Sequence, residues 1–271
     1  MKPQKIPIYL SILLATQAMA QISNKSYGSQ NIFIGNISSC YAANFSSLNN
    51  PALLGLNPNT QLAIAHETPF MQKKLSISAF SVQTEIKKIP IGLALVQTGN
   101  EQFKQQLFSL GLAKKLNKNL SIGIALNYLH SRQYLQENLN NLYGSLGFTL
   151  KVNKQVLIAT HLINPWASQY KLDRKQAIGQ FFQAGIAYQF SDKISFLAES
   201  QSQQNAAWIL RFGLLYKIKP QISFSMGFTQ KLDSFSGGIV LKKGSINWVI
   251  GAQLNLILGI SPSTELNYLL P

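Results

Sequence analysis

The stretch Asn119–His130, NLSIGIALNYLH, decides the fold class, because apolar residues occupy every second position in it. One face holds Leu120, Ile122, Ile124, Leu126 and Tyr128, and the other holds Ser121, Gly123, Ala125 and Asn127. Successive residues of a β-strand point to opposite faces. The stretch therefore predicts a strand with one apolar wall and one wall of small or polar residues.

The same alternation recurs along most of the chain from residue 61, for example in Pro220–Lys231 and Ser245–Leu256. Segments of this kind begin near residues 61, 74, 89, 105, 119, 141, 155, 179, 193, 206, 220, 233, 245 and 260. Each is about nine to twelve residues long, the length with which a tilted strand crosses a bilayer. Because lipid offers no partner to an open sheet edge, the strands must close. The sequence predicts an all-β fold, a transmembrane antiparallel β-barrel of about 14 strands over residues 61–271.

The connections between these segments alternate in length. Every second one is tight, as at Lys87-Lys88 and Lys243-Gly244, whereas the two longest, Ser131–Asn140 and Asn164–Ile178, fall among the others. Short periplasmic turns and longer outer loops are typical of outer-membrane barrels. Lysines gather at the tight turns, which leaves two explanations open. In the favoured explanation, the lysine side chains reach the lipid boundary and keep the turns soluble. In the other, the lysines form a basic periplasmic rim that docks an acidic partner.

The composition excludes several classes of protein. The 271 residues carry a formal charge of +15, but only 12% are charged and 46% are hydrophobic, which excludes a disordered chain. After residue 20, no apolar run of the length of about 18 residues needed for a transmembrane helix is found. Cys40 is the one cysteine, so a disulfide scaffold is excluded. The basic charge falls at regular turn positions without an aromatic-rich basic patch, so no nucleic-acid partner is expected.

Residues 1–20 are predicted to be a signal peptide. Lys2 and Lys5 precede the apolar stretch Ile6–Ala15, and the small residues Ala18 and Ala20 flank Met19 in a cleavage pattern. The mature chain is then expected to begin at Gln21. A buried N-terminal helix is the less favoured alternative.

Residues 21–60 do not alternate and form a separate segment ahead of the predicted barrel. They include Asn49-Asn50-Pro51-Ala52-Leu53, and the C-terminal half includes Phe182–Tyr188 and Leu258–Pro262. In these motifs the chain resembles the FadL-type outer-membrane proteins, in particular their PorV/PorQ-like branch, over roughly residues 35 to 270. It departs from them by ending in Leu269-Leu270-Pro271 instead of an aromatic residue, and by its shorter length.

The resemblance implies that residues 21–60 fold into the barrel as a plug, with Asn50, Pro51 and Ala52 helping to place it. An ordinary Asn-Pro turn is an equally good interpretation of these three residues. The resemblance also implies an accessory role in type IX protein secretion at the bacterial outer membrane. The alternative is a FadL-type channel for hydrophobic small molecules such as fatty acids. The expected partners are outer-membrane lipids and either secretion-system proteins or a hydrophobic ligand, and the barrel is expected to be monomeric.

The residues give no sign of catalysis. None of the histidines, His66, His130 and His161, shows the His-x-Ser spacing that would place a base and a nucleophile on one strand face. The scattered histidines and the single cysteine give no metal cluster, and no cofactor is expected. A lipid-modifying enzyme therefore ranks third among the function classes.

Arg211 and Glu199 both fall on the small-residue faces of neighbouring segments. A cross-strand pair inside the lumen is expected to hold the plug. A second interpretation is that Arg211 contacts the acidic head group of a ligand.

Overall fold

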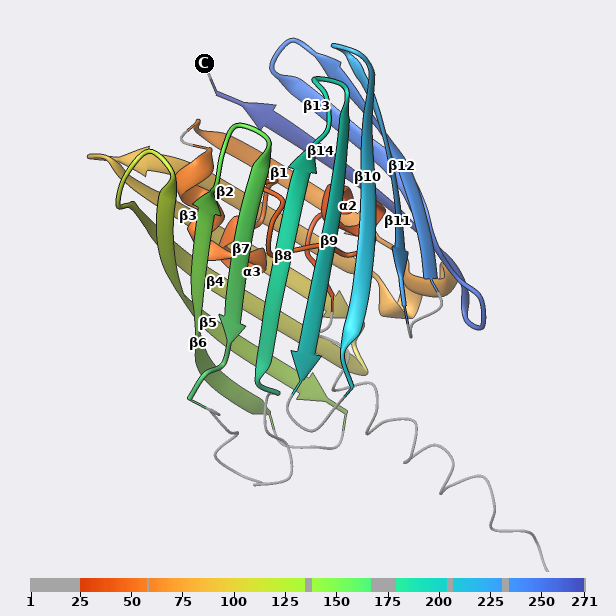
Figure 1. Cartoon of the computed structure of the whole chain (residues 1–271). Coiled ribbons are helices and arrows are strands. Elements are labelled where there is room, and N and C mark those ends of the chain that lie inside the picture. The colour runs from red at the N-terminus through yellow and green to blue at the C-terminus, as the bar shows by residue number, and fades with distance from the viewer. Residues whose placement is uncertain are drawn as a thin grey trace, which may run out of the picture.

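Fourteen antiparallel strands form a closed barrel in the computed structural model, which describes residues 25–57, 59–134, 138–166, 179–203, 207–230 and 234–270 (Figure 1). The strands are β1 (Gln61–Glu67), β2 (Ile77–Ile86), β3 (Ile89–Gly99), β4 (Phe103–Lys115), β5 (Leu120–Gln133), β6 (Leu139–Lys151), β7 (Val156–Ile163), β8 (Phe181–Gln189), β9 (Ile194–Gln203), β10 (Ile209–Lys219), β11 (Ile222–Thr229), β12 (Ser234–Lys243), β13 (Ile246–Asn255) and β14 (Gly259–Leu269). Each pairs with its neighbours in sequence, and β1 closes the barrel on β14. The predicted all-β barrel of about 14 strands is confirmed.

Several strand boundaries differ from the prediction by two or three residues, as at β10, which begins at Ile209 instead of near residue 206. The second strand begins at Ile77 instead of near residue 74, because Lys73–Leu75 forms a 3-10 turn, η4. The predicted loop Ser131–Asn140 is also shorter than expected. Ser131 is still in β5, where it lies opposite Gln105 of β4 and accepts a hydrogen bond of 2.8 Å from the amide of Gln105.

The outer wall of the barrel is apolar, as the alternation predicts. In β5, Ile124 is 56% exposed and Leu126 is 51% exposed, whereas the intervening Ala125 and the following Asn127 are buried. The same pattern runs around the barrel, so large apolar side chains cover its outside. Such a surface is stable in lipid and costly in water. Among the described residues, no helix has the length and apolar character to cross a membrane.

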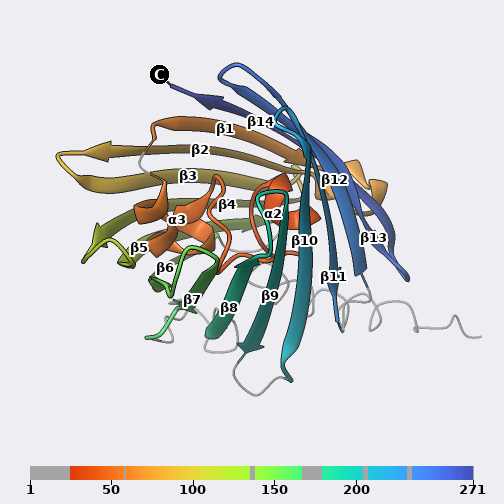
Figure 2. The same cartoon turned by 45° about the horizontal axis from the view of Figure 1, so that its top comes forward.

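The N-terminal residues 25–57, called here the inner segment, lie inside the barrel (Figure 2). They contain two short helices, α2 (Ser29–Phe33) and α3 (Ser46–Asn49), and a 3-10 turn, η2 (Pro51–Leu56). A further 3-10 turn, η3 (Pro69–Met71), follows β1. The predicted signal peptide and residues 21–24 lie outside the described residues.

Inward-facing glycines let the inner segment approach the barrel wall. A Cβ atom on Gly123 would lie 2.3 Å from the amide nitrogen of Ala52, and one on Gly213 would lie 2.6 Å from the carbonyl oxygen of Ile34. No side chain fits at such distances. Glycines with similarly close contacts to the inner segment occur on β3, β4, β5, β6, β8, β10, β11, β12 and β13 (Gly92, Gly111, Gly123, Gly147, Gly185, Gly213, Gly227, Gly238 and Gly251).

Candidate functional site

Three buried glutamates of the barrel wall hold the inner segment. Glu67 of β1, Glu199 of β9 and Glu265 of β14 are between 1% and 4% exposed. The chain has only nine acidic residues, so a third of them lie inside the barrel. A buried carboxylate is stable only when it is paired and hydrogen-bonded, and each of these finds its partners mainly in the inner segment.

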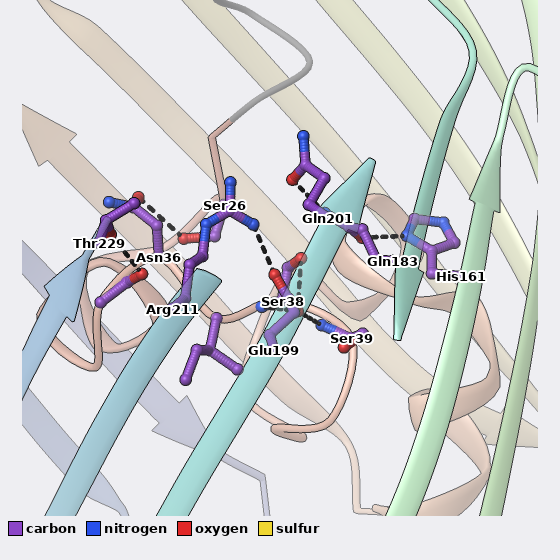
Figure 3. Close-up of polar contacts among 12 residues, drawn as sticks. Ser26, Asn36, Ser38, Ser39, His161, Gln183, Glu199, Gln201, Arg211 and Thr229 are labelled. Atoms are coloured by element: carbon purple, nitrogen blue, oxygen red, sulfur yellow. Dashed lines mark hydrogen bonds and ion pairs between the residues drawn. The ribbon is translucent and has the colours of Figure 1, made fainter. Parts of the chain in front are cut away.

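Glu199 binds both the inner segment and Arg211 (Figure 3). Its Oε2 atom accepts hydrogen bonds from the backbone N–H groups of Ser38 and Ser39, at 2.9 and 2.6 Å. Its Oε1 atom accepts a hydrogen bond of 2.5 Å from Nη1 of Arg211, which lies directly opposite on β10. Both side chains of this ion pair are almost fully buried. The structure thus brings together the two residues that the sequence placed in the lumen.

The other two glutamates hold the beginning and the middle of the inner segment. Glu67 forms an ion pair with Lys25. Glu265 accepts a hydrogen bond of 2.9 Å from the side-chain amide of Asn44 and a longer one, 3.4 Å, from the backbone N–H of Gln30. Glu67 and Glu265 lie on the paired strands β1 and β14, whereas Glu199 lies on β9, so the carboxylates hold the segment at two separate stretches of the wall.

Asn50, Pro51 and Ala52 lie at the start of η2, against the wall formed by β5–β7. The fully buried Asn50 side chain accepts a hydrogen bond from the Ala52 N–H at 3.0 Å and donates to the carbonyl oxygens of Ser39 and Thr160, at 2.8 and 3.2 Å. Pro51 is the first residue of the turn, where its missing N–H costs nothing. Asn50 therefore links two parts of the inner segment to β7.

A row of polar side chains crosses three neighbouring strands of the inner wall (Figure 3). His161 Nδ1 lies 3.0 Å from Gln183 Oε1, and the Gln183 amide donates a hydrogen bond of 3.0 Å to Gln201 Oε1. All three side chains are buried. His161 thus belongs to a neutral hydrogen-bonded row of the wall.

On the opposite side of the interior an apolar cluster lies among polar side chains of the same strands, such as Gln83, Gln105 and Asn127. Phe45 and Leu48 of the inner segment pack on inward-facing residues of β1–β5, and the partly buried Ile77 and Tyr143 complete the cluster. The buried wall residues in this apolar cluster are Ala63, Ala65, Ala79, Ala94, Val96, Leu107 and Leu129. The cluster is thus a packed apolar contact between the inner segment and the wall, whose buried members are at most 8% exposed.

A small pocket opens beside this cluster, at the end of the barrel that carries the long connections. It lies between the start of the inner segment, the end of β1 and the beginning of β2, and the Lys25–Glu67 ion pair is part of its rim. Tyr27, Ala65 and Ala79 line the pocket and also belong to the apolar cluster. The pocket thus borders the apolar cluster.

Two histidines lie on the outer wall in arrangements that bear on the enzyme hypothesis. His66 Nδ1 is 3.1 Å from Ser78 Oγ, and its Nε2 is 3.5 Å from the Thr68 hydroxyl. His130 contacts Asn140 on the neighbouring strand. A hydrolase base needs a firmly held orienting group as well as a nucleophile, and His66 has only the long contact to Thr68 in this role. Across the described ranges, no group of three His, Cys, Asp or Glu residues could hold a metal ion.

The fold matches those of solved outer-membrane hydrocarbon channels. The Pseudomonas putida toluene transporter TodX is similar with a TM-score of 0.67 and 10% identity, over 90% of this chain and 96% of the other. The Ralstonia pickettii toluene transporter TbuX (TM-score 0.62, 12% identity, 90% and 97% covered) and the monoaromatic hydrocarbon channel CymD (0.65, 12%, 90% and 98%) are similar too. No protein-family model and no curated protein matches the sequence. At such low identities the match shows the fold, a barrel of the hydrocarbon-channel type.

Sequence reasoning identified the Glu199–Arg211 pair but missed Glu67, Glu265 and the pocket. The alternation that places Glu199 and Arg211 in the lumen also applies to Glu265, because Glu265 lies on the polar face of its strand between Ser263 and Asn267. The pocket left no such signal, because its lining residues, such as Tyr27, Ala65 and Ser263, lie far apart in the sequence and share no motif.

Proposed function

We propose that the chain is an outer-membrane channel for small hydrophobic molecules, with the inner segment acting as its plug. The observation that carries the proposal is that the pocket at the long-loop end borders the apolar cluster inside the barrel. An apolar molecule entering the pocket would meet alanine and tyrosine side chains first and then the leucines of the wall. Solved channels with this fold include toluene transporters and monoaromatic hydrocarbon channels, which supports the same class of ligand.

The inner segment would close the path beyond this cluster. Its backbone fills the space next to the inward glycines, and its polar groups are bound by glutamates of the wall. Transport then requires a local displacement of the segment. In this proposal the tight turns face the periplasm and the long connections face outward.

Narrowing the pocket tests the proposal. The variant Ala65→Phe places a ring where the pocket meets the apolar cluster, and Ala252→Phe adds the same ring to the lipid-facing side of β13 as a control. Uptake of radiolabelled toluene is measured in bacteria that carry each variant in the outer membrane. We expect Ala65→Phe to reduce the protein-dependent uptake at least fivefold and Ala252→Phe to leave it unchanged. Equal uptake by both variants would contradict the proposed route.

An accessory role in type IX protein secretion is the second candidate, inferred from the sequence resemblance. The hydrocarbon-channel fold favours the channel over this role. Purification from native membranes distinguishes the two, because a secretion component co-purifies with large protein partners, whereas a channel carries lipid or a small ligand.

A further inference from the structure

Twelve exposed lysines surround one end of the barrel. All six tight turns, between β2 and β3, β4 and β5, β6 and β7, β8 and β9, β10 and β11, and β12 and β13, carry at least one of them, and these turns lie toward the top of Figure 1. The lysines are Lys87, Lys88, Lys114, Lys115, Lys118, Lys151, Lys154, Lys193, Lys217, Lys219, Lys242 and Lys243. Two carboxylates accompany them among the described residues of this rim, Asp192 and Glu85, the latter 3.8 Å from Lys115.

Four of these lysines, called here the mouth lysines, are on the lumen side of their strands. Directly paired residues of neighbouring strands share a face. Lys115 pairs with Ser121, whose hydroxyl binds the inner segment, and Lys242 lies two residues beyond the buried Val240. Lys151 lies two residues after the buried Thr149 and therefore on the same face of β6. Lys217 pairs with Ser223, which shares a face of β11 with the buried Ser225. The mouth lysines are Lys115, Lys151, Lys217 and Lys242.

Lipid contact does not explain the mouth lysines. A lysine at the membrane boundary extends its side chain along the outer wall toward the lipid head groups. Lys114 and Lys243 can do so, because they pair with the exposed outer-wall residues Ile122 and Ile246. The mouth lysines start from the opposite face and surround the opening. Like charges around one opening repel each other and favour the approach of anionic groups.

We propose that the mouth lysines dock a carboxylate-rich segment of a soluble protein across this end of the barrel. Fourteen strands spaced by about 4.8 Å and tilted as in other barrels enclose a mouth roughly 25–30 Å wide. A small anion could contact one or two of the four lysines, but an extended acidic polypeptide reaches across all of them. Every cation of the rim is a lysine, so the rim offers point charges and no guanidinium fork for the bidentate binding of phosphate.

This docking surface lies at the opposite end of the barrel from the pocket, so it does not depend on the proposed transport of hydrophobic molecules. It is tested with the full protein in nanodiscs of zwitterionic lipid, which leave both ends accessible. The probe is a fluorescein-labelled peptide of about 20 glutamates, whose binding is followed by fluorescence anisotropy. We expect binding that weakens as the salt concentration rises.

The decisive comparison is between two variants with the same net charge. In the first, the mouth lysines carry Lys115→Gln, Lys151→Gln, Lys217→Gln and Lys242→Gln. In the second, the changes are Lys114→Gln and Lys243→Gln on the outer side of the same rim, and Lys73→Gln and Lys74→Gln at the other end. We expect the first variant to bind the peptide at least tenfold more weakly than the second. A heat-dependent shift in gel mobility checks that both remain folded.

Three outcomes would overturn the proposal. The first is no peptide binding by the unmodified protein. The second is an equal loss in both variants, which would show that binding follows net charge alone. The third is loss of peptide binding in nanodiscs with about 30% phosphatidylglycerol, which would assign the mouth lysines to lipid head groups.

Discussion

Gly227 of β11 lies against the backbone of Gly35 so closely that a Cβ atom on Gly227 would be 1.9 Å from the Gly35 amide nitrogen. The barrel wall and the inner segment are therefore fitted backbone to backbone at this point. Gly237, on the neighbouring strand, has the opposite orientation, and its Cβ would meet only a carbonyl oxygen at 3.6 Å.

We expect Gly227→Ala to displace the inner segment and Gly237→Ala to be tolerated. The added methyl group at Gly227 has no space unless the backbone moves, which costs about 1–3 kcal/mol or more. Limited proteolysis of the folded barrel measures the change, because a displaced segment is cut while the strands stay protected. If the protease cuts residues 25–57 equally slowly in the two variants, the barrel wall and not the inner segment moves to accommodate the methyl group.

Arg211→Leu is expected to lower the stability of the protein by about 3–5 kcal/mol, because it leaves the buried Glu199 carboxylate without its cation. Replacing both residues, with Glu199→Gln and Arg211→Leu, removes the unpaired charge and should recover part of the loss. Denaturant unfolding followed by tryptophan fluorescence measures all three variants. A double variant no more stable than Arg211→Leu would contradict this account.

The same Arg211→Leu variant tests the head-group interpretation. Arg211 is 1% exposed and is bound to Glu199, so a ligand carboxylate would have to compete with Glu199 for it. If Arg211 contacts the ligand, binding of a fatty acid weakens on substitution. Unchanged binding together with lower stability would restrict Arg211 to holding the inner segment.

Asn50→Ala should lower the free energy of unfolding by about 1–3 kcal/mol, because it weakens the attachment of the inner segment to the barrel wall. The change leaves the Ala52 N–H and the Ser39 carbonyl without their hydrogen bonds in a buried place. Asn119→Ala, in an exposed turn, is the control. Both are compared by denaturant unfolding and by proteolysis of the inner segment, and an effect equal to that of the control would identify Asn50-Pro51 as an ordinary turn.

Cys40 reports on the seating of the inner segment through its reactivity. The thiol is 1% exposed, and burial together with the nearby Glu199 carboxylate raises its pKa well above the ordinary value. Only the thiolate is a good nucleophile, so maleimide labelling of the folded protein should stay slow from pH 7 to pH 9 and become fast on unfolding. The control is a Cys40→Ser, Asn119→Cys variant, whose exposed thiol should react at once. Labelling of Cys40 at the control's rate would mean that the segment is not held in the lumen.

The barrel could be predicted because every strand repeats one simple signal. Alternation over Leu120–Tyr128 and its counterparts follows directly from the requirement that one wall meets lipid and the other does not. The register between neighbouring strands could not be predicted in the same way. It depends on pairings such as Gln61 with Gln83 and Gln105 with Ser131, which involve single polar side chains on faces of otherwise small residues.

The site was harder to predict than the wall around it. The alternation of side chains along the strands placed Glu199 and Arg211 in the lumen. Their roles, however, depend on Ser38 and Ser39, which bind Glu199 through backbone N–H groups. Every residue type except proline has such a group, so this contact cannot be predicted from the identity of the residues. Lys25 likewise meets Glu67 across 42 residues of sequence. Contacts of this kind arise from the folded path of the inner segment, which has no periodicity to follow.

The close fit between the inner segment and the inward glycines has a consequence for biogenesis. The hydroxyl groups of Ser29 and Ser263 are hydrogen-bonded, although 234 residues separate them, and β1 and β14 meet at the seam. A chain segment fitted this closely cannot be threaded into a finished barrel. We expect the N-terminal residues to be held in place while successive hairpins are added around them, so that the pairing of β14 with β1 is the last step. The inner segment, which is made before any of the strands, would then serve as the core on which the barrel is assembled.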